Sequence, residues 1–224
     1  MSRPHEDRER HTLVDHRPGG SPVAFSAESW VAVGVAGVKA ERTDACLSAY
    51  ETLVEKARTS NAHAGPAALL ASGDGRRVVI LLGVAGHEGF RHLAAAWDDH
   101  HRVAQHRDIA EALSLALYEV VANVGSAGVD PAAHDVTQYE RIDKPLPRAS
   151  EVFTALRRAP DFRGATVLRK DGATATLILS SFAHAAAYES FRASDEAVAV
   201  LGPVGQPGDT NFPVHARKTI AAGN

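Results

Sequence analysis

Two histidines occupy similar places in the two halves of this 224-residue chain, where they could transfer protons. His87 closes the segment Val84–His87, and His184 closes the segment Ser181–His184; each follows a predicted strand and precedes a predicted helix. The imidazole pKa ordinarily lies near neutral pH, so either side chain could take a proton from a phenol or another acidic O–H or C–H group. The alternative for each histidine is a structural role at the start of its helix.

Hydrogen-bond donors follow the second histidine along the chain. Tyr188 and Phe191, three residues apart, mark the inner face of the predicted helix, and Tyr188 and Arg192 are possible donors to an anionic oxygen. For Arg192 a position on the surface is the simpler alternative. The sequence therefore offers a base and two donors in one short stretch.

Aromatic residues at helical spacing accompany both histidines. They usually form core, and they bind ligands only where the gap between helix and sheet stays open, because ligand pockets are mostly apolar with few polar groups. We interpret them either as core or as the substrate-binding lining of a pocket. In the second half they are Phe182 and Phe191, and in the first half Phe90 and Trp97.

A metal site is not expected. The most ligand-like cluster runs from Asp98 through His101 to Asp108, but His101 and His106 are too far apart in sequence to share a helix face. The chain has neither an HExxH motif nor paired CxxC motifs. We interpret this segment as a charged, solvated helix and expect no metal ligands.

The hydrophobic pattern predicts the elements that must position these side chains. Alternating and continuous apolar runs indicate strands, and apolar residues three and four apart indicate helices. The order strand, helix, strand, strand, helix, strand occurs twice, which favours two ferredoxin-like split βαβ units related by a pseudo-two-fold axis. The predicted strands are 30–39, 67–71, 77–84, 113–123, 136–142, 165–170, 174–181 and 212–219. The predicted helices are 43–58, 87 to about 110 and 150–158, with one helix or more from 185 to about 201.

Composition limits the range of partners. A formal net charge of -3 without a cluster of basic residues argues against nucleic acid. No apolar run approaches the roughly 18 residues of a membrane span, and the single cysteine, Cys46, cannot form an internal disulfide. We therefore expect a cytoplasmic protein with a small-molecule partner and no contact with a membrane.

Several of these features resemble one protein family. The Asp161–Ala165 turn, the Asp171-Gly172 hairpin and the spacing from Phe182 through Tyr188 to Phe191–Ser194 are similar to the antibiotic biosynthesis monooxygenases, which are dimeric α+β barrels. The resemblance covers the last third of the chain closely and the first half in outline. Phe182 stands where the family usually has Trp, and Phe191 where it often has His.

The resemblance implies an α+β fold in which one chain supplies both units of the barrel. We expect a leader over residues 1–24, a first unit over 25–124, a linker over 125–134 and a second unit over 135–224. The implied activity is that of a cofactor-independent oxygenase that uses O₂ to convert an aromatic polyketide-type phenol or anthrone to a quinone. Our hypothesis assigns the base to His184 or His87.

Other functions remain open at this point. The same architecture hosts proteins that bind haem or another small molecule, and cyclase-like accessory proteins without oxygenase activity. A haem-dependent protein would use histidine as the axial ligand. Whether the fused pair acts alone or associates further as a homodimer is also left open.

Overall fold

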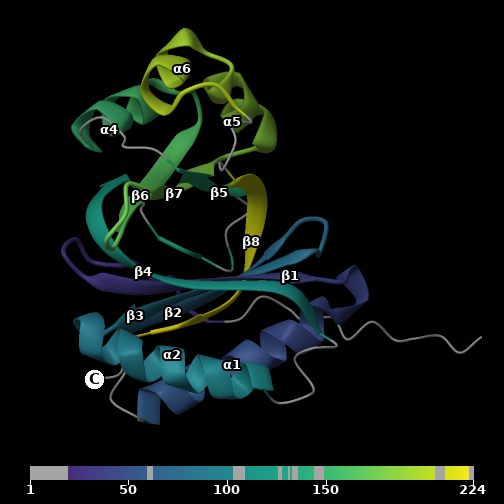
Figure 1. Cartoon of the computed structure of the whole chain (residues 1–224). Helices are drawn as coiled ribbons and strands as arrows, with labels where there is room; N and C mark the ends of the chain where they lie inside the picture. Colours follow the sequence, from purple (N-terminus) through teal and green to yellow (C-terminus); the bar gives the residue numbers. More distant parts are fainter. Residues whose placement is uncertain are drawn as a thin grey trace, which may run out of the picture.

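The protein is an eight-stranded antiparallel barrel with helices on two opposite outer sides (Figure 1). The computed structural model describes residues 20–59, 63–102, 109–125, 128–130, 132, 136–143, 149–204 and 210–221. The first half comprises β1 (Trp30–Val38), η1 (Ala40–Arg42), α1 (Thr43–Thr59), β2 (His63–Ser72), β3 (Arg77–Val84), α2 (Gly86–Arg102) and β4 (Ala110–Gly125). The second half comprises β5 (Val136–Ile142), α4 (Ala149–Arg158), β6 (Phe162–Lys170), β7 (Thr176–Phe182), α5 (Ala185–Arg192), α6 (Asp195–Leu201) and β8 (Thr210–Ile220).

Both halves contribute their strands in the same order. Around the barrel the order is β1-β3-β2-β8-β5-β7-β6-β4. Each half therefore places its fourth strand beside its first, and its third strand between its first and second, as in a ferredoxin-like unit. The seams between the halves, β2 with β8 and β4 with β6, are equivalent under a pseudo-two-fold. The predicted fold class is confirmed; the unit boundaries stay a prediction, because β4 and β8 each pair with strands of both halves.

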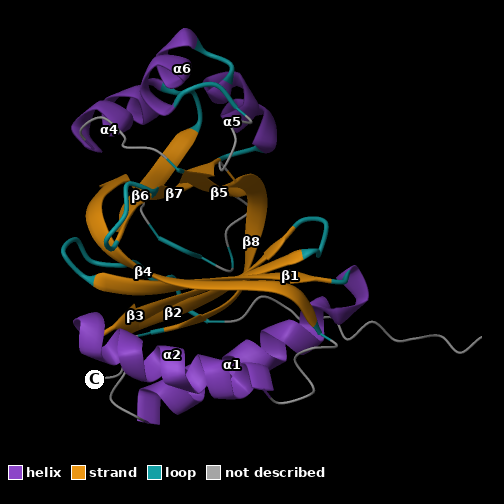
Figure 2. Ribbon diagram, viewed as in Figure 1, coloured by secondary structure: helices purple, strands orange, loops and turns teal. Residues whose placement is uncertain are grey.

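Side chains along each strand point alternately into the barrel and outward toward the helices, and this produces three hydrophobic cores. In β1, Val31 and Val33 point into the barrel, whereas Ala32 and Ala36 point outward beneath α1 and α2. The second half repeats this arrangement under α4, α5 and α6 (Figure 2). Two helix–sheet cores thus flank a third core inside the barrel, where Tyr139 stacks on Phe212 with ring centroids 4.8 Å apart.

Strand β7 is buried on both faces. Leu177 and Leu179 lie in the barrel core, whereas Ile178 and Phe182 lie beneath the helices. The hairpin before β7 forms as predicted, with Gly172 at φ +65°, where an L side chain would be strained.

One residue of the N-terminal segment that the structure describes is packed against the barrel. Residues 20–24 fall within the segment predicted as a leader, but Val23 is buried and pairs with Val129 across the barrel end, with N–O distances of 3.0 and 2.8 Å. This part of the predicted leader packs against the barrel because the apolar side chains of Val23 and Phe25 enter the barrel core. Residues 1–19 lie outside the described residues.

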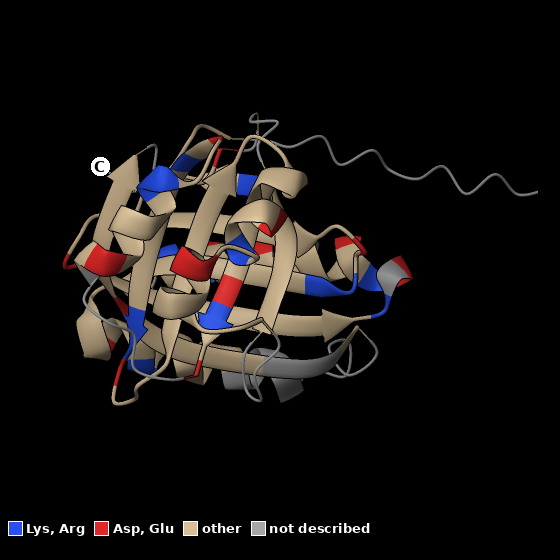
Figure 3. Ribbon diagram, turned by 90° about the horizontal axis from the view of Figure 1, so that it is seen from above, with Lys and Arg blue, Asp and Glu red and all other residues tan. Residues whose placement is uncertain are grey.

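Charged residues of both signs are interspersed over the surface seen from above the helices α4, α5 and α6 (Figure 3). None of the described helices is long and apolar enough to cross a membrane.

Candidate functional site

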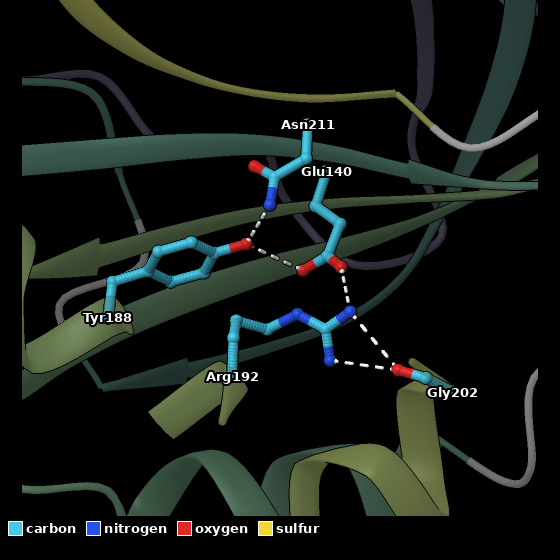
Figure 4. A network of polar contacts seen from close by, with 5 residues as sticks. All are labelled: Glu140, Tyr188, Arg192, Gly202 and Asn211. Atoms are coloured by element: carbon cyan, nitrogen blue, oxygen red, sulfur yellow. Dashed lines mark hydrogen bonds and ion pairs between the residues drawn. The ribbon is translucent and has the colours of Figure 1, made fainter. Parts of the chain in front are cut away.

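A buried ion pair lies in the second helix–sheet core. Glu140 of β5 and Arg192 of α5 are in contact, with an Nη2–Oε1 distance of 2.9 Å (Figure 4). Their side chains are only 6% and 5% exposed. Charged residues are rarely buried unless they are paired, because moving a charge out of water is costly. This core therefore contains a feature that packing alone does not require.

Two further side chains join the pair into a network. The Tyr188 hydroxyl donates to Glu140 Oε2 at 3.2 Å, and Asn211 Nδ2 donates to the Tyr188 oxygen (Figure 4). Both terminal nitrogens of Arg192 also donate to the carbonyl of Gly202, each at 3.2 Å. Burial raises the pKa of Tyr188, and the adjacent Glu140 raises it further, so the phenol stays protonated at neutral pH.

The network leaves one donor and one acceptor unused. Arg192 Nε and Asn211 Oδ1 are both buried, and neither has a hydrogen-bond partner among the described residues. A buried polar atom without a partner costs free energy, so such atoms call for an explanation. A ligand that accepts from Nε and donates to Oδ1 would satisfy both.

Strand alternation, strand pairing and helical spacing together bring these side chains to one place. Tyr139 points into the barrel, so its neighbour Glu140 points outward, toward the helices. Asn211 is the partner of Glu140 in the ladder between β5 and β8. Tyr188 and Arg192 are four residues apart in α5, on its buried face.

Aromatic rings surround the network. Phe182 is fully buried and lies edge-on to Tyr188, with centroids 5.5 Å apart, and 5.9 Å from the ring of Phe191. The structure thus brings together three residues that the sequence singled out. Their role in substrate binding stays a prediction, because these contacts are also those of a packed core.

The aromatic residues singled out in the first half belong to the other helix–sheet core. Trp97 stacks on Tyr50 with centroids 5.1 Å apart, and Phe90 is partly buried against the same cluster. Trp97 lies directly over Gly34, where an added Cβ would be 2.6 Å from the indole. The structure therefore separates Trp97 and Phe90 from the polar network of the second half.

His184 caps α5. Its Nδ1 accepts from the backbone N–H of Ala187 at 3.1 Å, and its Nε2 lies 3.3 Å from Asp161 Oδ2. The neutral ring therefore carries its proton on Nε2, and neither nitrogen is free to accept a proton unless a contact breaks. The side chain is 60% exposed.

His87 is also exposed. Its Nε2 lies 3.0 Å from Asp171 Oδ2 in the β6–β7 turn, and the side chain is 62% exposed. The ring contacts Trp30, with centroids 4.7 Å apart. His184 immediately precedes α5, whereas His87 is the second residue of α2, so the two histidines are not at equivalent positions as the sequence suggested. The first half has one more residue between the end of its third strand and the histidine. This residue is Gly86, whose φ of +65° forms the turn into α2.

Sequence reasoning missed Glu140 and Asn211. A signal was available for Glu140: a carboxylate in a strand that helices were expected to cover must find a partner. For Asn211 no signal existed beyond its place at the start of the last strand. Only the ladder between β5 and β8 shows that the two meet.

Whether the segment from Asp98 to Asp108 binds a metal ion is not tested, because its side chains lie outside the described residues. Within the part of the chain that the structure describes, no three His, Cys, Asp or Glu side chains are grouped so that they could hold a metal ion.

The polar network has no counterpart in the first half. Glu140 pairs with Ile178, four residues before the end of β7, and Gly34 pairs with Ile80, four residues before the end of β3. Gly34 is therefore the equivalent of Glu140. By strand register, the residue equivalent to Asn211 is Leu115, the ladder partner of Gly34. By position from the start of the helix, the residues equivalent to Tyr188 and Arg192 are Gly89 and Leu93.

Comparison with solved structures shows the fold over most of the chain. An anthrone oxidase-like protein aligns with a TM-score of 0.64 at 14% identity, over 91% of this chain and 97% of that one. A provisionally named monooxygenase of Fusobacterium nucleatum aligns with a TM-score of 0.59 at 13% identity, over 89% and 97%. Another, of Lactobacillus acidophilus, aligns with a TM-score of 0.50 at 8% identity, over 88% and 98%. No protein-family model and no curated protein matches the sequence.

Proposed function

We propose that this chain is a cofactor-independent monooxygenase whose active site is the helix–sheet core of its second half. The observation that carries the proposal is the buried network of Glu140, Arg192, Tyr188 and Asn211, which has an unused donor and an unused acceptor. Perturbed, buried titratable groups cluster at functional sites. The fold shared with structures named for oxidases and monooxygenases supports oxygen chemistry as the class of reaction.

The proposed substrate is an aromatic polyketide-type phenol or anthrone. In an anthrone, the central CH₂ becomes a ketone: one atom of O₂ enters the ring, and the other leaves as water with the two methylene hydrogens. The deprotonated ring supplies the electrons to O₂, so the protein needs only to bind the ring, remove a proton and stabilise the anion. The name of one structural neighbour, anthrone oxidase-like, supports this class.

The geometry suggests how a proton would move. Tyr188 already donates to Glu140, so the phenol oxygen can accept a substrate proton as its own proton passes to the carboxylate. Neutralising Glu140 releases the charge of Arg192 from its partner. The guanidinium, through its unused Nε, would then stabilise the substrate anion in a site where water is excluded. Asn211 Oδ1 would accept a hydrogen bond from a substrate hydroxyl.

Haem does not fit the described residues well. An axial histidine must reach into a covered site, yet His87, His92, His184 and His215, the histidines whose side chains the structure describes, are all exposed. The residues of α5 that face the core are Ala187, Tyr188, Phe191 and Arg192, and none of them is a histidine. We therefore retain the cofactor-free reaction in the proposal.

Oxygen uptake with 1,8-dihydroxyanthrone tests the proposal, with the spontaneous reaction subtracted. Glu140→Gln and Tyr188→Phe should each lower turnover on the order of 10²-fold if the pair transfers a proton. Glu196→Gln is the matched control, because it removes a carboxylate from an exposed ion pair with Arg158. Full activity in both Glu140→Gln and Tyr188→Phe would reject this site. Saturable binding without oxygen uptake would indicate a binding protein instead.

The histidines remain an alternative source of the base and are tested in the same assay. His184→Asn preserves a capping side chain, and His87→Asn removes an exposed ring. Turnover close to that of the wild type in both variants would assign the base to the buried network, whereas a large loss in either would return that role to the histidine.

A further inference from the structure

A cavity of about 280 Å³ opens at the end of the barrel where β1 begins. It belongs to the first half and shares no residue with the polar network of the second half. Its apolar walls are Phe25, Trp30, Pro66 and Val84. Pockets for drug-sized ligands begin at about 300 Å³, so this cavity suits a smaller molecule.

Two glycines form the strand side of the cavity. Pairing between β2 and β3 passes from His63 with Val84 to Ala67 with Leu82, so the regular ladder is interrupted there. Pro66 lies in the interruption and has no N–H to restore the ladder. Gly65 and Gly83 approach so closely that a Cβ on Gly83 would lie 2.7 Å from Gly65 Cα. A Cβ on Gly65 would lie 3.3 Å from Gly83 Cα, so glycine at both positions lets the two strands approach this closely at the edge of the cavity.

The opposite side of the cavity is formed by residues 25–29, which are held across the barrel end. The carbonyl of Phe25 accepts from Asn123 Nδ2 at 2.7 Å, and the Phe25 ring is buried in the barrel core. The backbones of Glu28 and Ser29 exchange hydrogen bonds with Val120 at 2.8 and 2.9 Å. The cavity is therefore bounded by fixed backbone on both sides.

The polar groups of the lining are hydroxyls without charge. Ser29 Oγ donates its proton to the carbonyl of Ser26, which leaves the Ser29 oxygen free to accept a hydrogen bond. None of the lining residues is charged, so an ion entering the cavity would lose its hydration without compensation. Trp30 offers a ring for stacking, and this ring also contacts the ring of His87.

We propose that this cavity is a second binding site, for a small neutral aromatic alcohol of one or two rings. The ligand ring packs against Trp30 and Pro66, and its hydroxyl donates to Ser29 Oγ. Aromatic stacking and one hydrogen bond fix its orientation, as in other small-molecule sites. The site is independent of the reaction proposed for the second half.

Titration with 2-naphthol, followed by the indole N–H signals of the two tryptophans, tests this site. The Trp30 signal, identified from a Trp30→Phe variant, should shift and saturate, while the signal of the buried Trp97 stays in place. Ser26→Phe keeps the carbonyl that Ser29 uses and should block the cavity, weakening binding at least tenfold. Ala27→Phe is the matched control, since Ala27 is exposed and does not line the cavity.

Further measurements separate this site from others. Ser29→Ala should weaken 2-naphthol several-fold, and the 2-naphthoate anion should leave the Trp30 signal unmoved. Glu140→Gln should bind 2-naphthol as the wild type does, which distinguishes this cavity from the second helix–sheet core. The absence of a saturable Trp30 shift, or unchanged binding in both Ser26→Phe and Ser29→Ala, would overturn the proposal.

Discussion

The two helix–sheet cores have the same strand order but opposite chemistry at equivalent positions. Beneath α1 and α2, Gly34 leaves room for Trp97, which fills the space and stacks on Tyr50. Beneath α5, the equivalent space holds the Glu140–Arg192 pair. Glycine and leucine in one half thus replace glutamate, tyrosine, arginine and asparagine in the other.

The difference shows how one half of a repeated fold can specialise. An aromatic ring over glycine is a closed, apolar core that stabilises the barrel by burial. A buried ion pair, by contrast, contributes little stability compared with apolar packing, so its presence is better explained by function. We infer that the first half supports the barrel and that the second half carries the proposed chemistry.

The largest effect is expected when the ion pair is broken. Arg192→Leu, which copies Leu93 of the first half, leaves Glu140 buried without its partner and should lower the free energy of unfolding by about 3–5 kcal/mol. The double variant Glu140→Leu/Arg192→Leu should recover most of this loss, because no charge remains to be desolvated. Urea unfolding measures both, and a double variant that loses as much stability as Arg192→Leu would contradict the cost assigned to the unpaired carboxylate.

In the first half, the close packing at Gly34 should be sensitive to one added methyl group. A Cβ at this position would lie 2.6 Å from both Ile80 Cγ2 and Trp97 Cη2. Gly34→Ala should therefore cost about 1–3 kcal/mol through overpacking. The cost should be smaller in a Trp97→Phe background, since the smaller ring leaves space; an equal cost in both backgrounds would contradict the role given to Trp97.

Alkaline pH should affect the first core through Cys46. Burial raises the pKa of this thiol from 9.0 to about 12. Above pH 9 the thiol loses its proton in the unfolded chain but keeps it in the folded chain. The contribution of this thiol to the free energy of unfolding is therefore fully present below about pH 9 and is lost as the pH rises toward 12. Between pH 8 and 10.5 the free energy of unfolding should fall by about 2 kcal/mol because of this group. Unfolding of Cys46→Ala should show a correspondingly shallower slope over that range, and an unchanged slope would argue against the shift.

The smallest effects are expected at the two histidines. His184→Ala removes the cap of α5 and should cost about 1 kcal/mol, whereas His184→Asn should restore it. His87→Ala loses an exposed contact with Asp171 and should cost less than about 1 kcal/mol. Thermal unfolding compares the three variants; a larger loss at His87 than at His184 would reverse the roles assigned here.

The amino-acid sequence alone determined the order of elements and the fold class. Alternation in Trp30–Val38, the stripe from Leu47 to Ala57 and the Asp171-Gly172 turn each depend on neighbours within one element, so local pattern is sufficient to predict them. The same pattern predicted that Tyr188 and Phe191 share the buried face of one helix.

Only the tertiary structure decided which residues share the candidate site. Glu140 and Asn211 lie on strands far apart in the chain, and the β5–β8 ladder brings them to Tyr188. Likewise, the equivalence of Gly34 with Glu140 follows from the strand register, which a repeat of short motifs does not define. Contacts between distant segments depend on how the barrel closes, and this information is not contained in the spacing of any one stretch.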